Sequence, residues 1–251
     1  MKADKGWPNL RKGFSPAKQT YLYRNKYDMK GCVTMEKKSL SELKEVLYSG
    51  VVADILDSMG VRRNSLEYGL RPLDNDYKVL GRAFTVLAAD VYEIPEEPYK
   101  LELESVDKVG PDEVIVASTN GSTSSGFWGE LLTTRSMQNG CVGAVIDGYT
   151  RDAKRILDLK FPLFVRGHCP LDSKGRTDVI AYQVPIEIRG IPVNPGDYIF
   201  GDIDGVVVIP AAIADEVFEK CLEKIEGENY VREQIRAGRS ASDVYKETGI
   251  L

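Results

Sequence analysis

The stretch Val142–Val165, VGAVIDGYTRDAKRILDLKFPLFV, contains the pattern that decides the fold. Residues 142–146 form a short apolar run that is typical of a buried strand, and residues 147–148 form a turn. Residues 151–160 have helical spacing, and Leu163–Val165 is a second apolar run. This order of strand, helix and strand is the sequence form of parallel pairing. The stretch therefore predicts an α/β fold.

Further apolar runs lie on both sides of this stretch. Residues 83–89 and 114–117 predict buried strands upstream of it. Downstream, the short β segments 186–193, 197–200 and 206–209 are separated by Arg189-Gly190, Pro195-Gly196 and Asp204-Gly205. All three dipeptides are turn signals. We therefore expect antiparallel or mixed pairing in the second half of the chain.

Helices are predicted from spacing and capping signals. Ser39-Leu-Ser-Glu42 has the spacing of a capping box, and a second helix follows from about Val51 to a C-terminal Gly60. Residues 127–139 and 213–238 also show helical spacing. The acidic, proline-bearing segment 92–109 predicts a loop with one helical turn at most.

The chain divides into an extension and a body. Residues 1–35 are polar, contain several tyrosines and show no clear period, so they predict an N-terminal extension that packs on the body or on a neighbouring subunit. Residues 36–251 contain no internal repeat or linker. They predict a single α/β domain, and the chain is long enough to bury a sizeable core.

Composition excludes several classes of function. A formal charge of −5 gives no large basic footprint for nucleic acid. The longest apolar stretch, residues 206–214, is roughly half of what a membrane span needs. The N-terminus lacks a secretory signal, so we expect a cytoplasmic protein. His168 is the single histidine, which excludes two-histidine zinc sites within one chain, and any metal should be bound mainly by oxygen.

Two segments combine polar residues with a predicted helix start. Residues 120–129 lead into Glu130, and residues 147–152 follow the strand 142–146. In mostly parallel α/β folds, ligands collect beyond the carboxyl ends of strands, where helix N-termini point. The free N–H groups of such ends suit a carboxylate or phosphate. Together the two segments predict a site for one small anion.

Arg151 and Asp152 are the sharpest candidates within these segments. The arginine fork binds a carboxylate at two points. Asp152, with Glu130 nearby, is suited to hold Mg²⁺ or Mn²⁺ with several waters retained. The structural alternative is that Asp152 caps a helix and Arg151 is a solvated surface residue. Spacing alone leaves both interpretations open.

Other polar clusters favour structural roles. Asp202 and Asp204 resemble a carboxylate pair, but Asp-Gly between apolar runs is the usual hairpin signal. His168 and Cys169 are sequence neighbours whose side chains point apart on an extended chain, so a base and nucleophile pair is not favoured. No strand is followed by Gly-x-Gly-x-x-Gly or by a Gly-Lys-Ser/Thr loop, so nucleotide binding is not supported.

Four motifs together resemble a known family. They are Trp128–Leu132 (WGELL), Val145–Asp152 (VIDGYTRD), Phe161–Gly167 (FPLFVRG) and Pro195–Pro210 (PGDYIFGDIDGVVVIP). Their order and spacing resemble the family of the regulator of ribonuclease activity A and the class II 4-hydroxy-4-methyl-2-oxoglutarate aldolases. The resemblance implies a swivelling β/β/α sandwich, phosphohistidine-domain-like, with mixed sheets flanked by helices. It also implies a homotrimer or a dimer of trimers, with active sites at subunit boundaries.

The resemblance also assigns roles to residues. The aldolases carry an acidic residue, then twenty residues, then Arg-Asp, and Glu130 stands in that relation to Arg151-Asp152. By this carry-over Asp152 anchors the metal through waters, Arg151 holds the substrate, and Glu130 orients or activates a water. The amides of Gly129, Glu130, Leu131 and Leu132 bind the substrate carboxylate. Glu228 is matched to a glutamate that the aldolases draw from a neighbouring subunit.

The implied activity is that of a divalent-metal-dependent lyase. It would cleave or decarboxylate a small 2-oxo acid through a pyruvate enolate stabilised by Mg²⁺ or Mn²⁺, as in 4-hydroxy-4-methyl-2-oxoglutarate aldolase and oxaloacetate decarboxylase. One departure is Arg155, where the family often has an acidic residue. The alternatives are a non-catalytic regulator that binds a ribonuclease or other protein, and a sugar-acid enzyme with the same site and different loops.

Overall fold

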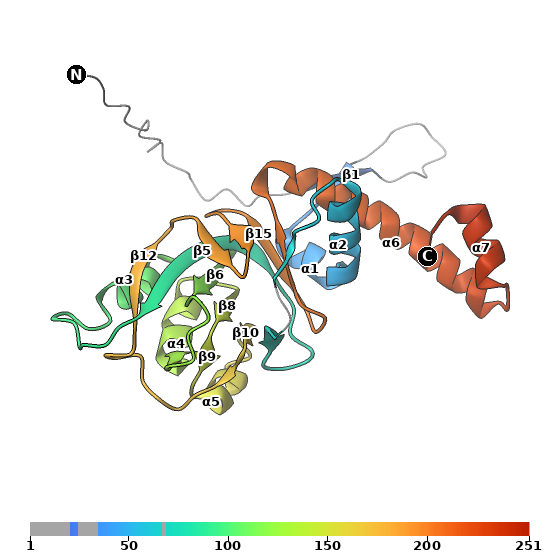
Figure 1. Cartoon of the computed structure of the whole chain (residues 1–251). Coiled ribbons are helices and arrows are strands. Elements are labelled where there is room, and N and C mark those ends of the chain that lie inside the picture. The colour runs from blue at the N-terminus through green and yellow to red at the C-terminus, as the bar shows by residue number, and fades with distance from the viewer. Residues whose placement is uncertain (1–20, 25–34, 67–68, 251) are drawn as a thin grey trace, which may run out of the picture.

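The computed structural model describes residues 21–24, 35–66 and 69–250 (Figure 1). They form an α/β fold in which a curled, mixed sheet is flanked by helices, so the predicted fold class is confirmed. The predicted extension, residues 1–35, lies largely outside the described residues. Its described part, β1 (Tyr21–Arg24), pairs antiparallel with β2 (Met35–Lys38).

The largest sheet in the described ranges has nine strands. Eight follow the order β3-β16-β15-β5-β6-β8-β10-β4, and β12 pairs with β5 off this path. Their bounds are β3 Ser65–Leu66, β4 Arg71–Pro72, β5 Val79–Asp90, β6 Glu113–Ser118, β8 Gly143–Asp147, β10 Leu163–Val165, β12 Thr177–Tyr182, β15 Tyr198–Gly201 and β16 Val206–Ile209. Strands β5, β6, β8 and β10 are parallel to one another, which confirms the parallel pairing predicted for β8 and β10, and the other pairings are antiparallel.

The two faces of the parallel strands belong to separate cores. Because side chains alternate along a strand, Val114 and Val145 point to one face and Ile115 and Ala144 to the other. The first pair packs in a cluster with an antiparallel hairpin. This hairpin consists of β13 (Ile186–Ile188) and β14 (Ile191–Val193). The second pair packs beneath helices, so both faces of these strands are covered.

The helices form two groups (Figure 1). The first contains α1 (Leu40–Val46), α2 (Ser49–Ser58) and α6 (Ala214–Arg236), which share a core with β15 and β16. The second contains α3 (Lys100–Lys108), α4 (Glu130–Gln138) and α5 (Ala153–Asp158). A short 3-10 helix, η1 (Ala211–Ile213), precedes α6. The last helix, α7 (Ala241–Thr248), packs on α6. None of the described helices is long and apolar enough to cross a bilayer.

A small parallel sheet positions the candidate site. Its strands, in the order β11-β9-β7, are β7 (Gly126–Trp128), β9 (Tyr149–Thr150) and β11 (Gly167–His168). Strand β7 leads directly into α4, and β9 leads into α5. Because β7 and β9 are paired neighbours, the N-termini of α4 and α5 lie side by side.

Two predicted element boundaries were wrong. The segment 92–109 was predicted as a loop, but residues 100–108 form the helix α3. Its buried positions include Glu102 and Ser105, so the apolar period that marks a helix is absent. The helix predicted over 127–139 begins only at Glu130, because residues 126–128 pair with β9 as a strand.

Other local predictions are confirmed. The capping box is present: the Ser39 side chain accepts a hydrogen bond from the Glu42 backbone N–H, and the Glu42 side chain accepts one from the Ser39 backbone N–H. Helix α2 ends just before Gly60, whose φ of 86° lies in the left-handed region. The segments from residue 186 to 209 pair as antiparallel hairpins. The structural role favoured for Asp202 is confirmed, since its backbone closes the turn with Gly205.

The buried side chain of Asp202 also anchors the first group of helices. Its carboxylate accepts hydrogen bonds from the backbone N–H of Ser49 at 2.8 Å and from the Ser49 hydroxyl at 2.7 Å. Ser49 is the first residue of α2, so the carboxylate serves the unpaired N–H groups and positive dipole of the helix N-terminus.

We expect Asp202→Ala to lower the free energy of unfolding by about 2 to 4 kcal/mol, because it leaves two buried donors of Ser49 without an acceptor. Urea denaturation followed by circular dichroism measures this loss. Asp204→Ala is the matched control, because the side chain of Asp204 is exposed on the same turn. Equal effects of the two substitutions would contradict the anchoring role.

Candidate active site

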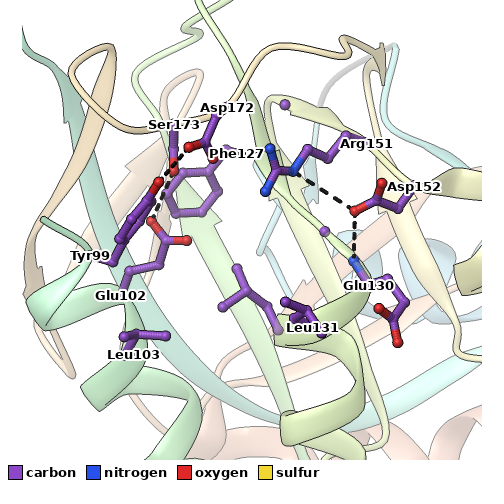
Figure 2. A pocket seen from close by; sticks show the side chains of 13 residues that line it. Tyr99, Glu102, Leu103, Phe127, Glu130, Leu131, Arg151, Asp152, Asp172 and Ser173 are labelled. Carbon is purple, nitrogen blue, oxygen red and sulfur yellow. Dashed lines mark hydrogen bonds and ion pairs between the residues drawn. The ribbon is translucent and has the colours of Figure 1, made fainter.

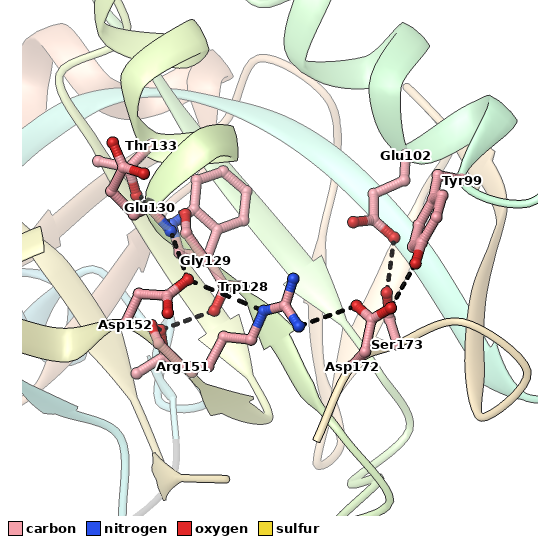
Figure 3. A network of polar contacts seen from close by, with 11 residues as sticks. Tyr99, Glu102, Trp128, Gly129, Glu130, Thr133, Arg151, Asp152, Asp172 and Ser173 are labelled. Carbon is pink, nitrogen blue, oxygen red and sulfur yellow. Dashed lines mark hydrogen bonds and ion pairs between the residues drawn. The ribbon is translucent and has the colours of Figure 1, made fainter. Parts of the chain in front are cut away.

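The candidate site begins at the junction of β7 and β9. The carbonyl of Trp128 accepts two hydrogen bonds, one from the backbone N–H of Arg151 and one from the Thr150 hydroxyl, both at 2.8 Å. Trp128 directly precedes Gly129, the N-cap of α4, and Arg151 directly precedes Asp152, the N-cap of α5. The bonds therefore join the chain at the start of one helix to the chain at the start of the other. Figure 3 shows the junction with the side chains of Arg151 and Asp152 beside it.

Asp152 closes the gap between the two helix starts. Its Oδ2 accepts a hydrogen bond from the backbone N–H of Glu130 at 3.4 Å and lies 3.8 Å from Arg151 Nε. Its φ of 57° is left-handed, a conformation that costs energy in a non-glycine residue and concentrates at functional sites. Both contacts use Oδ2, so Oδ1 has no protein partner within the described residues.

Gly129 leaves room for this close approach. A Cβ atom at this position would lie 3.2 Å from Asp152 Oδ2 and 3.4 Å from Arg151 Nε. The first of these separations is tighter than an ordinary van der Waals contact, so a side chain at residue 129 would push the carboxylate away from the Glu130 amide. The glycine therefore permits the two helix starts to share Asp152.

Arg151 lies between two carboxylates. One is Asp152, and the other is Asp172, whose Oδ1 lies 3.1 Å from Arg151 Nη1. Asp172 also accepts a hydrogen bond from the hydroxyl of Tyr99. Partial burial and the neighbouring Asp172 raise the pKa of Tyr99 to about 12, so the phenol stays a hydrogen-bond donor at neutral pH. The guanidinium is thus held in place while its side chain remains 37% exposed.

Glu102 lies on α3 at the opposite wall and is only 6% exposed. The Ser173 hydroxyl donates a hydrogen bond to its carboxylate at 3.3 Å. Burial raises the pKa of Glu102 to about 7, and the nearby negative charges of Asp172 and Asp178 add to this effect. Glu102 is therefore poised to exchange a proton near neutral pH.

These groups line one cavity of about 300 Å³ (Figure 2). Arg151, Asp152 and Glu130 lie on one side of it, and Tyr99, Glu102, Asp172 and Ser173 lie on the other. Its remaining lining residues are Leu103, Gly126, Phe127, Gly129, Leu131 and Leu132. The predicted residues of the two helix starts are thus brought together at one cavity.

The amides at the start of α4 are open to a ligand. The N–H of Glu130 is bonded to Asp152, whereas the N–H groups of Leu131 and Leu132 have no hydrogen-bond partner in the described structure. The carboxylate of Glu130 accepts a hydrogen bond from Thr134 at 2.9 Å, one turn along the same helix. The helix end can therefore bind an anion through two amides.

Glu228 does not line this cavity in the same chain. It lies on α6, accepts a hydrogen bond from the Tyr48 hydroxyl and is 3.9 Å from Lys224. It faces a second cavity of about 400 Å³. This cavity is lined by Tyr48, Gly50, Asp54, Glu228, Val231, Arg232, Ile235 and Arg236. The role carried over for Glu228 therefore requires a neighbouring subunit, as the resemblance implies.

Arg155 and His168 also lie outside the main cavity. Arg155 is exposed on α5, and its backbone N–H donates to the Asp152 carbonyl. His168 and Cys169 line an adjacent hollow on the far side of Arg151 and Asp152.

A metal ion would have one direct carboxylate ligand here. The described residues contain no group of three or more His, Cys, Asp or Glu side chains placed to hold a metal. Asp152 presents a free Oδ1 and is 43% exposed. This donor set fits a hard divalent ion such as Mg²⁺, which keeps several of its waters and binds through one or two carboxylates. It does not fit a cage built from protein ligands alone.

Comparisons with known proteins agree with the fold. The family described as "RraA-like: Aldolase/RraA" matches residues 51–208. A protein of Halalkalibacterium halodurans named "Putative 4-hydroxy-4-methyl-2-oxoglutarate aldolase" is 32% identical over 69% of this chain and 77% of its own length. Protein DlpA of Legionella pneumophila is 31% identical over 76% of this chain, but the match spans only 30% of DlpA.

Among solved structures, the chain is similar to RraAS2 of Streptomyces coelicolor. The two share 30% identity and a TM-score of 0.67, over 76% of this chain and 96% of the other. RraAS2 is described as an unusual member of the RNase ES inhibitor RraA protein family. Both an aldolase name and a regulator name therefore occur among similar proteins.

The raised pKa of Glu102 has a consequence for stability. The ordinary pKa of a glutamate is 4.5, and that of Glu102 in the folded protein is about 7. At a pH between these two values, Glu102 is protonated in the folded protein but ionised in the unfolded chain. This contribution to stability is present below pH 4.5 and falls as the pH rises to 7 and above. We expect Glu102→Gln to gain roughly 1 to 3 kcal/mol relative to the parent between pH 5 and pH 8.

Urea unfolding of both proteins across this pH range measures the difference. Glu96→Gln, which changes an exposed carboxylate ahead of the same helix, is the control and should show no such trend. A constant difference between Glu102→Gln and the parent would show that Glu102 is ionised in the folded protein throughout.

Proposed function

The chain belongs to the RraA-like family, and we propose that it is a lyase that releases pyruvate from a small 2-oxo acid by aldol cleavage or decarboxylation. The observation that carries this proposal is the meeting of Arg151, Asp152 and the N-terminus of α4 at one cavity. Several relatives that carry the name "Putative 4-hydroxy-4-methyl-2-oxoglutarate aldolase" support the same class of reaction.

Arg151 binds the substrate carboxylate in this proposal. Its planar fork is oriented by Asp152 and Asp172, and it is partly open to the cavity. The free amides of Leu131 and Leu132 add two further donors at the positive end of α4. A 2-oxo acid held this way has its keto group directed toward Asp152.

Asp152 would hold a divalent ion such as Mg²⁺ or Mn²⁺ through its free oxygen, because such ions bind proteins through one or two carboxylates. When bound, such an ion supplies positive charge beside the keto oxygen, where negative charge develops during carbon–carbon cleavage. Glu130, at the cavity edge, orients or activates a water that takes the proton from the distal hydroxyl in aldol cleavage. Decarboxylation needs no such base.

A neighbouring subunit completes the site in our proposal. Glu228 belongs to the second cavity of its own chain, so it reaches the main cavity only from another copy. We propose a homotrimer or a dimer of trimers, in which α6 of one subunit lies beside the cavity of the next.

A second candidate function is binding to a ribonuclease. The similarity to RraAS2, whose description names an RNase inhibitor family, favours this alternative. A regulator needs no arginine and carboxylate pair around an open cavity, so the retained Arg151 and Asp152 favour the lyase.

We expect Asp152→Asn to lower kcat/KM for pyruvate release by at least about 100-fold, because the amide cannot hold the divalent ion. The assay follows pyruvate from oxaloacetate and from 4-hydroxy-4-methyl-2-oxoglutarate with Mg²⁺, after chelation, and after Mg²⁺ is restored. Asp158→Asn is the matched control, since Asp158 lies on the surface of the same helix and pairs with Lys154. Chelation without effect would exclude the metal, and a folded parent without activity on any 2-oxo acid would favour the regulator.

We expect Arg151→Lys to raise KM and to lower kcat/KM by at least about 10-fold. An ammonium keeps the charge but cannot contact a carboxylate and Asp172 with one rigid plane. Steady-state kinetics with oxaloacetate measure the change, and circular dichroism shows whether the fold is retained. Kinetics equal to those of the parent would remove Arg151 from carboxylate binding.

A further inference from the structure

The main cavity carries an excess of negative charge. Arg151 is the only basic residue among those that line it in the described structure. Four acidic residues share the same lining: Glu102, Glu130, Asp152 and Asp172. A substrate with two carboxylates would therefore add a second negative charge where cations are scarce.

The single basic side chain of the cavity is already paired with protein carboxylates. Arg151 contacts Asp152 at 3.8 Å and Asp172 at 3.1 Å, so its charge is balanced on both sides. One substrate carboxylate can join it with the help of the α4 amides. A second carboxylate at the far end of the substrate would face Asp172 and Glu102, and like charges brought together in a partly buried site repel strongly.

The wall formed by α3 is built for hydroxyl groups instead. This side of the cavity presents the phenol of Tyr99 and the carboxyl group of Glu102 from the start of α3, and the Asp172 carboxylate and Ser173 hydroxyl from the segment before β12, as Figure 2 shows. Their internal hydrogen bonds, from Tyr99 to Asp172 and from Ser173 to Glu102, leave lone pairs on each oxygen for further donors. Such a set recognises alcohols, whose hydroxyl groups can donate hydrogen bonds to these oxygens.

Resting on the proposed lyase function, we propose that the substrate is a 4-hydroxy-2-oxo acid with one carboxylate and a neutral, hydroxylated tail of the sugar-acid type. Its carboxylate lies at Arg151 and the α4 amides, and its tail lies against Tyr99, Glu102, Asp172 and Ser173. The bond between C3 and C4 breaks, and the 4-hydroxyl loses its proton as C4 becomes an aldehyde. The electron pair passes to the pyruvate enolate, which takes up a proton to give pyruvate.

Two substrates that differ only at C5 test this inference. One is 4,5-dihydroxy-2-oxopentanoate, which carries a hydroxymethyl group there, and the other is 4-hydroxy-2-oxoglutarate, which carries a carboxylate. Pyruvate release is followed with Mg²⁺ for both, and oxaloacetate is assayed in parallel. We expect kcat/KM to be at least 10-fold higher for the dihydroxy acid. Equal or better cleavage of the dicarboxylate would overturn the inference.

Substitutions in the cavity wall test whether its residues cause the preference for the dihydroxy acid. Asp172→Asn removes one negative charge with little change of shape, and it should lower the ratio of the two kcat/KM values at least threefold. Tyr99→Phe should lower kcat/KM for the dihydroxy acid more than for 4-hydroxy-2-oxoglutarate, because both substrates share the Arg151 that Asp172 orients but only the dihydroxy acid has a hydroxylated tail. Glu104→Gln is the control, because Glu104 lies on α3 outside the cavity and bonds Tyr182. An unchanged ratio in both wall variants would also overturn the inference.

The outcomes separate this inference from the proposed function. Pyruvate released from oxaloacetate and 4-hydroxy-2-oxoglutarate, with little from the dihydroxy acid, would leave the lyase in place and reject the hydroxylated tail. No pyruvate from any of the three acids would reject the lyase function and this inference with it.

Discussion

The carbonyl oxygen of Trp128 is the point on which the candidate site depends. By accepting hydrogen bonds from Arg151 and Thr150, it joins β7 to β9 at the place where each strand gives way to a helix. The bare backbone of Gly129 then lets the Asp152 carboxylate reach the first amide of α4. Two helix N-termini, which would otherwise attract separate anions, are thereby made into one site.

The rest of the fold holds this junction in place. The parallel strands β6, β8 and β10 are covered on both faces, so β9 and β11 leave the sheet from rigid supports. The helix α3 then brings Tyr99 and Glu102 to the opposite side of the cavity. Glu102 adds to the acidic residues that surround the single arginine of the cavity. This excess of acidic side chains is the basis for preferring a substrate with one carboxylate over a substrate with two.

Sequence patterns predicted much of this arrangement. The strand, helix and strand order around Arg151 has its own local signals, and the spacing between Glu130 and Arg151 matched a known family. The wall residues Tyr99, Glu102, Asp172 and Ser173 were missed. Asp172 and Ser173 lie in a turn-rich segment without a motif, and α3 was hidden because its inward positions are polar. The acidic composition of residues 92–109 was the one available signal, and it predicted a loop where the structure has the helix α3.

Local chemistry is therefore what the sequence alone determined: where strands and helices begin, which turns are tight, and that Arg151 and Asp152 stand at a helix start. These properties depend on neighbours a few residues apart, such as a cap, a glycine or an alternating apolar run. Only the tertiary structure decided that Asp172 orients Arg151, that Glu102 is buried opposite, and that Glu228 faces a different cavity of its own chain. Those relations join residues from distant segments, whose separation in space is set by the packing of the sheet and its helices.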